Sequence, residues 1–115
     1  MAKNRCSNSD VSRFIEYRDK FETNNKTMFS EWCGSDEGHV GARTYTVYSY
    51  GYHFPMYVWD DQAQVWIGNK DKYSRTTSVH QTKARPRNVE HWFDTNTVKR
   101  IAYVGLAKVV AKRME

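Results

Sequence analysis

Residues 43–67 have the sequence RTYTVYSYGYHFPMYVWDDQAQVWI, in which β-branched and aromatic residues predominate. Such residues suit a pleated, half-buried surface, and Gly51 and residues 60–63 interrupt them with turn-forming residues. Because Pro55 has no N–H for a ladder hydrogen bond, the strand that contains it should either lie at a sheet edge there or begin after the proline. The pattern predicts an antiparallel meander of three strands: residues 43–50, 52–59 and 64–67.

The two faces of this predicted sheet differ in composition. Alternation should place Val47, Val58 and Ile67 on one face, where they pack on helices. The opposite face could stack on the bases of single-stranded nucleic acid, where each base contributes about 1 to 3 kcal/mol. Alternatively, its rings pair across strands and cover the second side of the sheet, which we favour because aromatic residues are enriched in strands whatever the function. The residues of this face are Tyr48, Tyr57, Trp59 and Trp66.

Two helices are predicted before the meander. Apolar residues recur at helical spacing from Val11 to Phe21, after a capping Ser9 or Asp10, and Asn24 can end the helix. A second, short helix is predicted over residues 27–33, with its apolar residues facing inward.

The connections and the C-terminal region are predicted as follows. Residues 34–41 contain three glycines and should form a loop. Residues 88–93 suit a short turn or helix. Thr95 or Thr97 can then cap a longer C-terminal helix over about residues 98–112.

These elements predict an α+β fold. A chain of 115 residues is the usual size of one domain, so we expect residues 1–115 to form a single domain in which residues 1–8 are flexible. The expected architecture is a small antiparallel sheet of three or four strands packed against N- and C-terminal helices. No apolar run approaches the roughly 18 residues that a membrane span needs, so we predict no membrane partner and a cytoplasmic location.

The cysteines give no sign of a disulfide framework or a metal site. Cys6 and Cys33 are expected to be free thiols in a reducing compartment. Their spacing from the histidines does not match a zinc-ligand pattern. We therefore predict neither a metal nor a cofactor.

Charge is unevenly distributed along the chain. Residues 1–68 contain seven Lys and Arg against nine Asp and Glu, whereas residues 69–115 contain eleven against four. A basic half indicates a surface that faces a polyanion, and DNA or RNA is the first candidate. A charged face that serves only solubility is the equally weighted alternative.

Residues 70–87 form the most basic strip and carry the candidate binding residues. Ser78 and Gln81 have the spacing of a capping box, which predicts a short helix that ends at Arg85 and Pro86. The start of that helix, with the hydroxyls of Thr76 and Thr77, could hold a phosphate or carboxylate, or could form an ordinary capped turn. The candidate nucleic-acid or partner-binding residues are Tyr48, Trp59, Trp66, Lys70, Lys72, Tyr73, Arg75, Thr76, Thr77, Ser78, His80, Gln81, Lys83, Arg85 and Arg87.

His80 is the one candidate catalytic residue. A histidine near Tyr73, Arg75 and Lys83 could act as a general acid or base in metal-independent phosphodiester cleavage. Histidine, tyrosine and arginine are also common on any basic surface, and the sequence does not fix their mutual geometry. We therefore favour a protein that is not an enzyme.

Part of the chain resembles a known group of proteins. The Tyr48-Ser49-Tyr50 strand, a Trp-bearing strand and the run Lys72-Tyr73-Ser74-x-Thr76-Thr77-Ser78-x-His80-Gln81 are similar to a group of small uncharacterised proteins encoded by bacteriophages. The resemblance covers about residues 43–86. It implies a viral origin and a location in the host cell, and it supplies no catalytic residues.

Three functions are consistent with these observations. The first is a small basic accessory protein of a phage that binds DNA or RNA. The second is an inhibitor that binds a host protein or ribonucleoprotein complex, such as a defence machine of the CRISPR or restriction type. The third is a metal-independent nuclease that uses His80. The sequence does not predict an oligomeric state.

Overall fold

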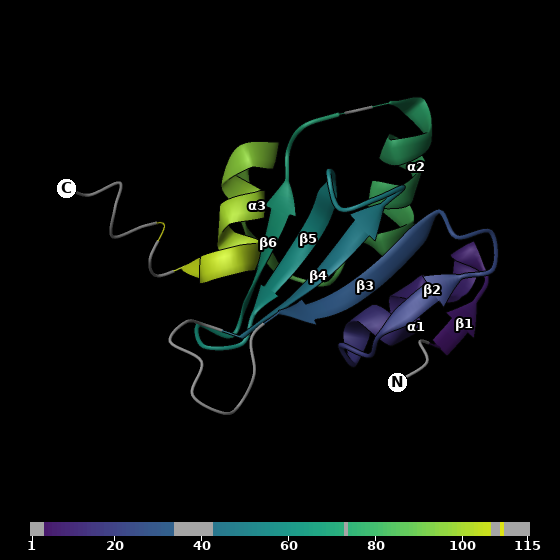
Figure 1. Ribbon diagram of the computed structural model, residues 1–115, viewed down its shortest axis with the longest axis horizontal. Helices are drawn as coiled ribbons and strands as arrows, with labels where there is room; N and C mark the ends of the chain where they lie inside the picture. The colour runs from purple at the N-terminus through teal and green to yellow at the C-terminus, as the bar shows by residue number, and fades with distance from the viewer. Residues whose placement is uncertain (1–3, 34–42, 73, 107–108, 110–115) are drawn as a thin grey trace.

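The structure, a computed structural model, describes residues 4–33, 43–72, 74–106 and 109 (Figure 1). The described strands form one seven-stranded sheet in which spatial order follows chain order, from β1 to β7. The strands are β1 (Asn4–Cys6), β2 (Phe21–Thr23), β3 (Met28–Cys33), β4 (Thr44–Ser49), β5 (Pro55–Asp60), β6 (Val65–Asn69) and β7 (Val89–Phe93). The helices are the 3₁₀ turn η1 (Asn8–Asp10) and the α-helices α1 (Val11–Glu16), α2 (Arg75–Ala84) and α3 (Thr95–Val104).

The sheet is mixed, with a parallel pair at each edge. β1 pairs with β2 in parallel and β6 pairs with β7 in parallel, whereas the pairs between β2 and β6 are antiparallel. Parallel neighbours need a crossover connection. Here η1 with α1 provides the first crossover and α2 the second. The prediction of a three- or four-stranded antiparallel sheet is therefore wrong, although the fold contains both helices and strands in the order expected of an α+β protein.

The central strands were predicted close to their observed positions. β4, β5 and β6 form the antiparallel meander, with Thr46 opposite Val58 and Val58 opposite Ile67. Pro55 is the first residue of β5, which lies between β4 and β6, so the prediction of a sheet edge at Pro55 or a strand that begins after it is wrong. At that position the missing N–H costs no interior ladder bond.

The predicted helix over residues 27–33 is wrong. This segment forms β3 and pairs with β4 along its whole length, from Met28 opposite Ser49 to Cys33 opposite Thr44. Six residues are too few for periodicity to separate a helix from a strand. The full antiparallel ladder of backbone hydrogen bonds with β4 stabilises the strand over the helix.

The other strands outside the meander were also missed. β7 occupies the segment predicted as a turn or helix, and β1 begins within the first eight residues. The N-terminal helix ends at Glu16 because Arg18 adopts a left-handed backbone with φ of 54°, and Phe21 belongs to β2. Non-local pairing, which single-sequence patterns do not report, creates these edge strands.

The C-terminal helix begins earlier than predicted and is interrupted at Gly105, beyond which Leu106 and Val109 are again helical. α3 is preceded by Asp94 as N-cap, whose carboxylate accepts a hydrogen bond from the Thr97 hydroxyl, and Gly105 with φ of 93° follows its last residue. The rest of the predicted helix, residues 107–108 and 110–112, lies outside the described residues, as does the loop predicted over residues 34–41.

Helices cover both faces of the sheet, as Figure 1 shows with α3 on one side and α1 and α2 on the other. On the α3 side, Val58 and Ile67 pack against Val98 and Ile101. On the α1 and α2 side, the core is rich in aromatic side chains. Its largest buried side chains include Phe21, Tyr45, Tyr57, Trp59 and Trp66.

This arrangement settles which residues share a face. Val47 lies opposite Tyr57 and packs in the aromatic core, so the prediction that it shares a face with Val58 and Ile67 is wrong. The Trp59 and Trp66 rings lie 5.5 Å apart and are only 8% and 6% exposed. The aromatic face is therefore a packed core formed by cross-strand pairs, not an open stacking surface.

Candidate nucleic-acid interface

The helix in the basic strip is capped by Ser74 and not by the predicted Ser78. The Ser74 hydroxyl accepts a hydrogen bond from the Thr77 N–H at 3.1 Å and donates one to the Thr77 hydroxyl at 3.0 Å. Ser78 is already inside the helix, where its N–H donates to the Ser74 carbonyl. α2 ends at Ala84, before Arg85 and Pro86, as predicted.

The predicted anion site at the start of this helix is only partly available. The Thr77 hydroxyl is buried and committed to the cap, while Arg75 and Thr76 are exposed. Lys70, Lys72 and Lys83 are exposed as well, and Tyr73 lies outside the described residues.

Gln81 is structural. Its side-chain amide nitrogen donates to the backbone carbonyls of Asn69 and Asp71 at 2.9 and 3.2 Å. Its backbone carbonyl accepts from the Tyr57 hydroxyl at 2.6 Å. Burial raises the pKa of Tyr57 to about 12, so the phenol stays protonated and remains a donor. These bonds attach α2 to β5 and to the end of β6.

His80 lies in a buried polar contact between α2 and β4. Its Nδ1 is 2.8 Å from the Ser49 hydroxyl, and the Tyr50 ring lies over it at 5.3 Å between centroids. The contact joins the two segments on which the phage resemblance rests. Ser49 is 1% exposed and His80 is 3% exposed, so neither can touch a substrate in this conformation. The geometry therefore gives no support to a catalytic role for His80.

Burial of His80 predicts a dependence of stability on pH. Desolvation, and to a smaller degree the Lys83 ammonium, lowers the pKa of the imidazole below its ordinary value of about 6.5. Above a pH of about 6.5, the imidazole is neutral in both the folded and the unfolded protein. As the pH falls through this value, His80 takes up a proton in the unfolded chain but resists protonation in the folded protein. The free energy of unfolding should therefore decrease. Urea unfolding at pH 7.5 and 5.5 measures this effect.

The control for this prediction is the exposed His91. His80→Gln should lower stability at pH 7.5 but flatten its decrease toward pH 5.5, whereas His91→Gln should retain the wild-type pH dependence. The same decrease in wild type and His80→Gln would contradict the assignment.

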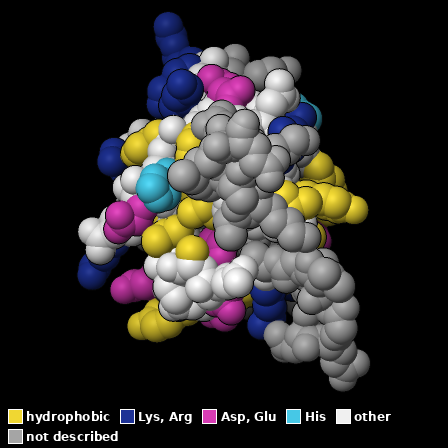
Figure 2. Space-filling model, turned by 90° about the vertical axis from the view of Figure 1, so that its left-hand side faces the viewer, with side chains coloured by type: hydrophobic (Ala, Val, Ile, Leu, Met, Phe, Trp, Pro, Cys, Tyr) yellow, Lys and Arg dark blue, Asp and Glu magenta, His cyan; other side chains and the backbone are white. Residues whose placement is uncertain are grey.

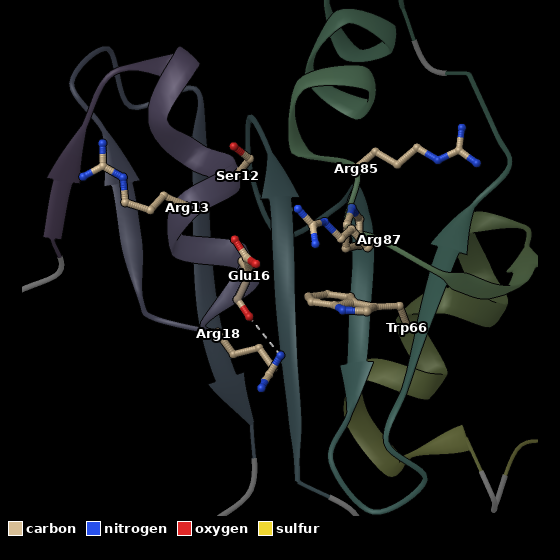
Figure 3. Close-up of a pocket in the computed structure, with 8 residues that line it drawn as sticks. Ser12, Arg13, Glu16, Arg18, Trp66, Arg85 and Arg87 are labelled. Atoms are coloured by element: carbon tan, nitrogen blue, oxygen red, sulfur yellow. Dashed lines mark hydrogen bonds between the residues drawn. The ribbon is translucent and has the colours of Figure 1, made fainter.

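A cleft among the described residues lies between α1 and the connection from α2 to β7 (Figure 3). Its volume is about 460 Å³. Arg85 and Pro86 follow the last turn of α2, and Arg87 lies in a bend between Pro86 and β7. The lining residues are Ser12, Arg13, Glu16, Arg18, Trp66, Arg85, Pro86 and Arg87.

The four arginines of the cleft differ in their contacts. Arg18 stacks on the Trp59 ring at 4.4 Å and donates to the Glu16 carbonyl at 3.0 Å. Arg85 lies 5.2 Å from the Trp92 ring, and Arg13 is 3.7 Å from the Asp10 carboxylate. Arg13 and Arg85 point away from the space between the two walls in Figure 3.

Arg87 and Glu16 face each other across this space (Figure 3). Within the described part of the chain, neither the Arg87 guanidinium nor the Glu16 carboxylate has a hydrogen bond or an ion pair. Both side chains are exposed. The cleft thus presents unused donors and acceptors next to the stacked Arg18.

A second hollow of about 290 Å³ adjoins the cleft through two shared residues, Trp66 and Arg87. It extends along β6 and the start of β7, past Trp59, Asn88 and Glu90. Arg87 therefore stands where the two depressions meet.

Sequence patterns identified only part of this site. Trp66, Arg85 and Arg87 were predicted and line the cleft, and Trp59 lines the second hollow. Tyr48 is half-buried on the opposite side, beside Tyr103 of α3. The missed residues come from the mildly acidic half of the chain, within α1 and just after it: Ser12, Arg13, Glu16 and Arg18.

The face beside α3 has a different character. Figure 2 shows Lys and Arg side chains interspersed with Asp and Glu among the described residues on that face.

Within the described ranges, no three His, Cys, Asp or Glu residues are grouped as metal ligands. The helices described here are also too short or too polar to cross a membrane.

None of the protein-family models, curated proteins or solved structures with which the chain was compared matches it.

Proposed function

We propose that this protein binds nucleic acid through the arginine cleft, as a small accessory protein encoded by a phage. The observation that carries the proposal is a single depression lined by four arginines, one of which, Arg87, faces Glu16 across it. Guanidinium groups present several N–H donors in a rigid fork that fits phosphate oxygens, and they also stack on bases. The phage origin rests on the resemblance of residues 43–86.

Binding in this proposal depends on guanidinium groups and not on the sheet's aromatic residues. Trp59 and Trp66 are buried in the core, and the Trp59 ring is already stacked by Arg18. Arg18 and Arg87 remain as donors to phosphates, and their planes can contact bases. A depression of about 460 Å³ lies in the usual size range of a ligand site.

The salt dependence of binding tests the proposal. Fluorescence anisotropy with labelled 12-nucleotide single strands of DNA and RNA should show binding at 50 mM salt that weakens at 200 mM. If the cleft neutralises two to four phosphates, the logarithm of the affinity should fall against the logarithm of salt concentration with a slope of roughly −1.5 to −3.

Two results would contradict the proposal. One is the absence of binding to any strand at low salt, and the other is an affinity that does not change with salt. If a host pull-down then recovered a stoichiometric protein, inhibition of a host machine would replace nucleic-acid binding as the function.

A further inference from the structure

Glu16 is the feature of the cleft that phosphate binding alone does not explain. Its exposed carboxylate faces Arg87 in a cleft lined by four arginines, and a negative charge there weakens the attraction for a polyanion. The carboxylate also does not serve to position an arginine, since Arg18 contacts the Glu16 backbone carbonyl and not its side chain. Its two oxygens are free to accept hydrogen bonds from a ligand.

The bases differ in what they can offer to a carboxylate. An ionised carboxylate only accepts hydrogen bonds and is best matched by two adjacent donors. On the Watson–Crick edge, guanine presents the N1–H and N2–H donors side by side. Adenine and cytosine each place an acceptor beside their amino group, and thymine or uracil flanks its single N–H with two carbonyl oxygens. Guanine alone therefore supplies the matching pair.

Arg87 completes this match. Next to its two donors, the Watson–Crick edge of guanine carries the O6 acceptor, so that the edge needs one donor and two acceptors from the protein. The guanidinium of Arg87 and the carboxylate of Glu16 face each other across the cleft, and neither has another partner in the described residues (Figure 3). In a duplex this edge is occupied by cytosine, so only an unpaired guanine can be recognised in this way.

We propose that the cleft selects an unpaired guanine in single-stranded nucleic acid, with Glu16 accepting from N1–H and N2–H and Arg87 donating to O6. This inference rests on the proposed function and adds a base preference to it. Arg18 remains available to a phosphate of the same strand, because only one of its nitrogens has a hydrogen bond.

The test uses nine-nucleotide thymine strands whose central position is guanine, adenine, cytosine or thymine. A bidentate base contact discriminates by about 1 to 3 kcal/mol, so the guanine strand should bind about 5-fold to 100-fold more tightly than the others. Inosine, which lacks the N2 amino group, should bind with intermediate affinity. 7-Deazaguanine, which changes only the opposite edge, should bind like guanine.

Variants of the two acidic side chains give the matched comparison. Glu16→Gln keeps one acceptor oxygen and should reduce the guanine preference to about twofold or less. Glu22→Gln removes the same charge outside the cleft, where Glu22 pairs with Arg5 at 3.5 Å, and should retain the preference.

The possible results separate the inference from the function on which it rests. Equal affinity for all strands, or a preference that survives Glu16→Gln, would overturn guanine selection while leaving nucleic-acid binding in place. Loss of affinity for 7-deazaguanine would also overturn it, because the opposite edge of the base would then be the one recognised. Failure of every strand to bind at low salt would remove the proposed function itself.

Discussion

Replacing Asp60 by alanine is expected to lower the free energy of unfolding by about 3 kcal/mol. Asp60 is 1% exposed at the end of β5. Its Oδ1 accepts from the N–H groups of Gln62 and Ala63 at 3.0 and 2.9 Å, and its Oδ2 accepts from the buried Leu106 N–H at 2.7 Å. Alanine would leave these donors without a partner, and the buried one would have no water to replace it.

Asp60 has this large effect because it joins two distant parts of the chain. One oxygen closes the turn between β5 and β6, and the other holds the segment that follows α3. Urea unfolding monitored by tryptophan fluorescence would measure the loss. Asn should be intermediate because it keeps one acceptor oxygen.

The neighbouring Asp61 provides the control. It accepts from the Trp59 indole at 3.0 Å but is only partly buried, so Asp61→Ala should cost less than about 1 kcal/mol. Equal losses for Asp60→Ala and Asp61→Ala would show that the buried acceptor has no special role.

The meander was predictable from the sequence because its signal is local. In β4, β5 and β6, β-branched and aromatic residues are bounded by turn residues, and each strand pairs with its neighbour along the chain. β1, β3 and β7 lack that signal. β1 and β7 are short strands held by parallel partners beyond a helix, and β3 has a mixed apolar pattern that fits one or two turns of helix equally well.

The same distinction applies to the candidate site. The basic character of residues 70–87 was visible in the sequence, but most of its side chains are dispersed around α2 or committed to the core, as for Thr77, His80 and Gln81. The cleft forms because the two crossovers lie on one face of the sheet, where α1 contacts α2. Counting charge by halves of the chain hid Arg13 and Arg18, since their half carries a slight negative balance.

The double variant Arg18→Glu/Arg87→Glu, which reverses the charge of two cleft arginines, is expected to reduce affinity for single-stranded nucleic acid by at least about a hundredfold at 50 mM salt. Each substitution removes a charge-assisted hydrogen bond to the nucleic acid, worth about 1.5 to 3 kcal/mol. Each also introduces a negative charge that repels the phosphates. The slope against salt should become shallower as phosphate contacts disappear. Anisotropy titrations at several salt concentrations measure both quantities.

The matched control reverses Arg75 and Lys83, which are exposed on α2 outside the cleft and change the net charge by the same amount. If binding depends on the cleft, this pair should weaken it only through the general reduction in charge, by severalfold.

Because Arg18 stacks on Trp59, its reversal could also lower stability by about 1 kcal/mol. Arg87→Glu alone avoids this effect, since Arg87 has no partner among the described residues. If the Arg75 and Lys83 reversal weakened binding as much as the cleft reversal, the basic strip of α2 and not the cleft would be the binding surface.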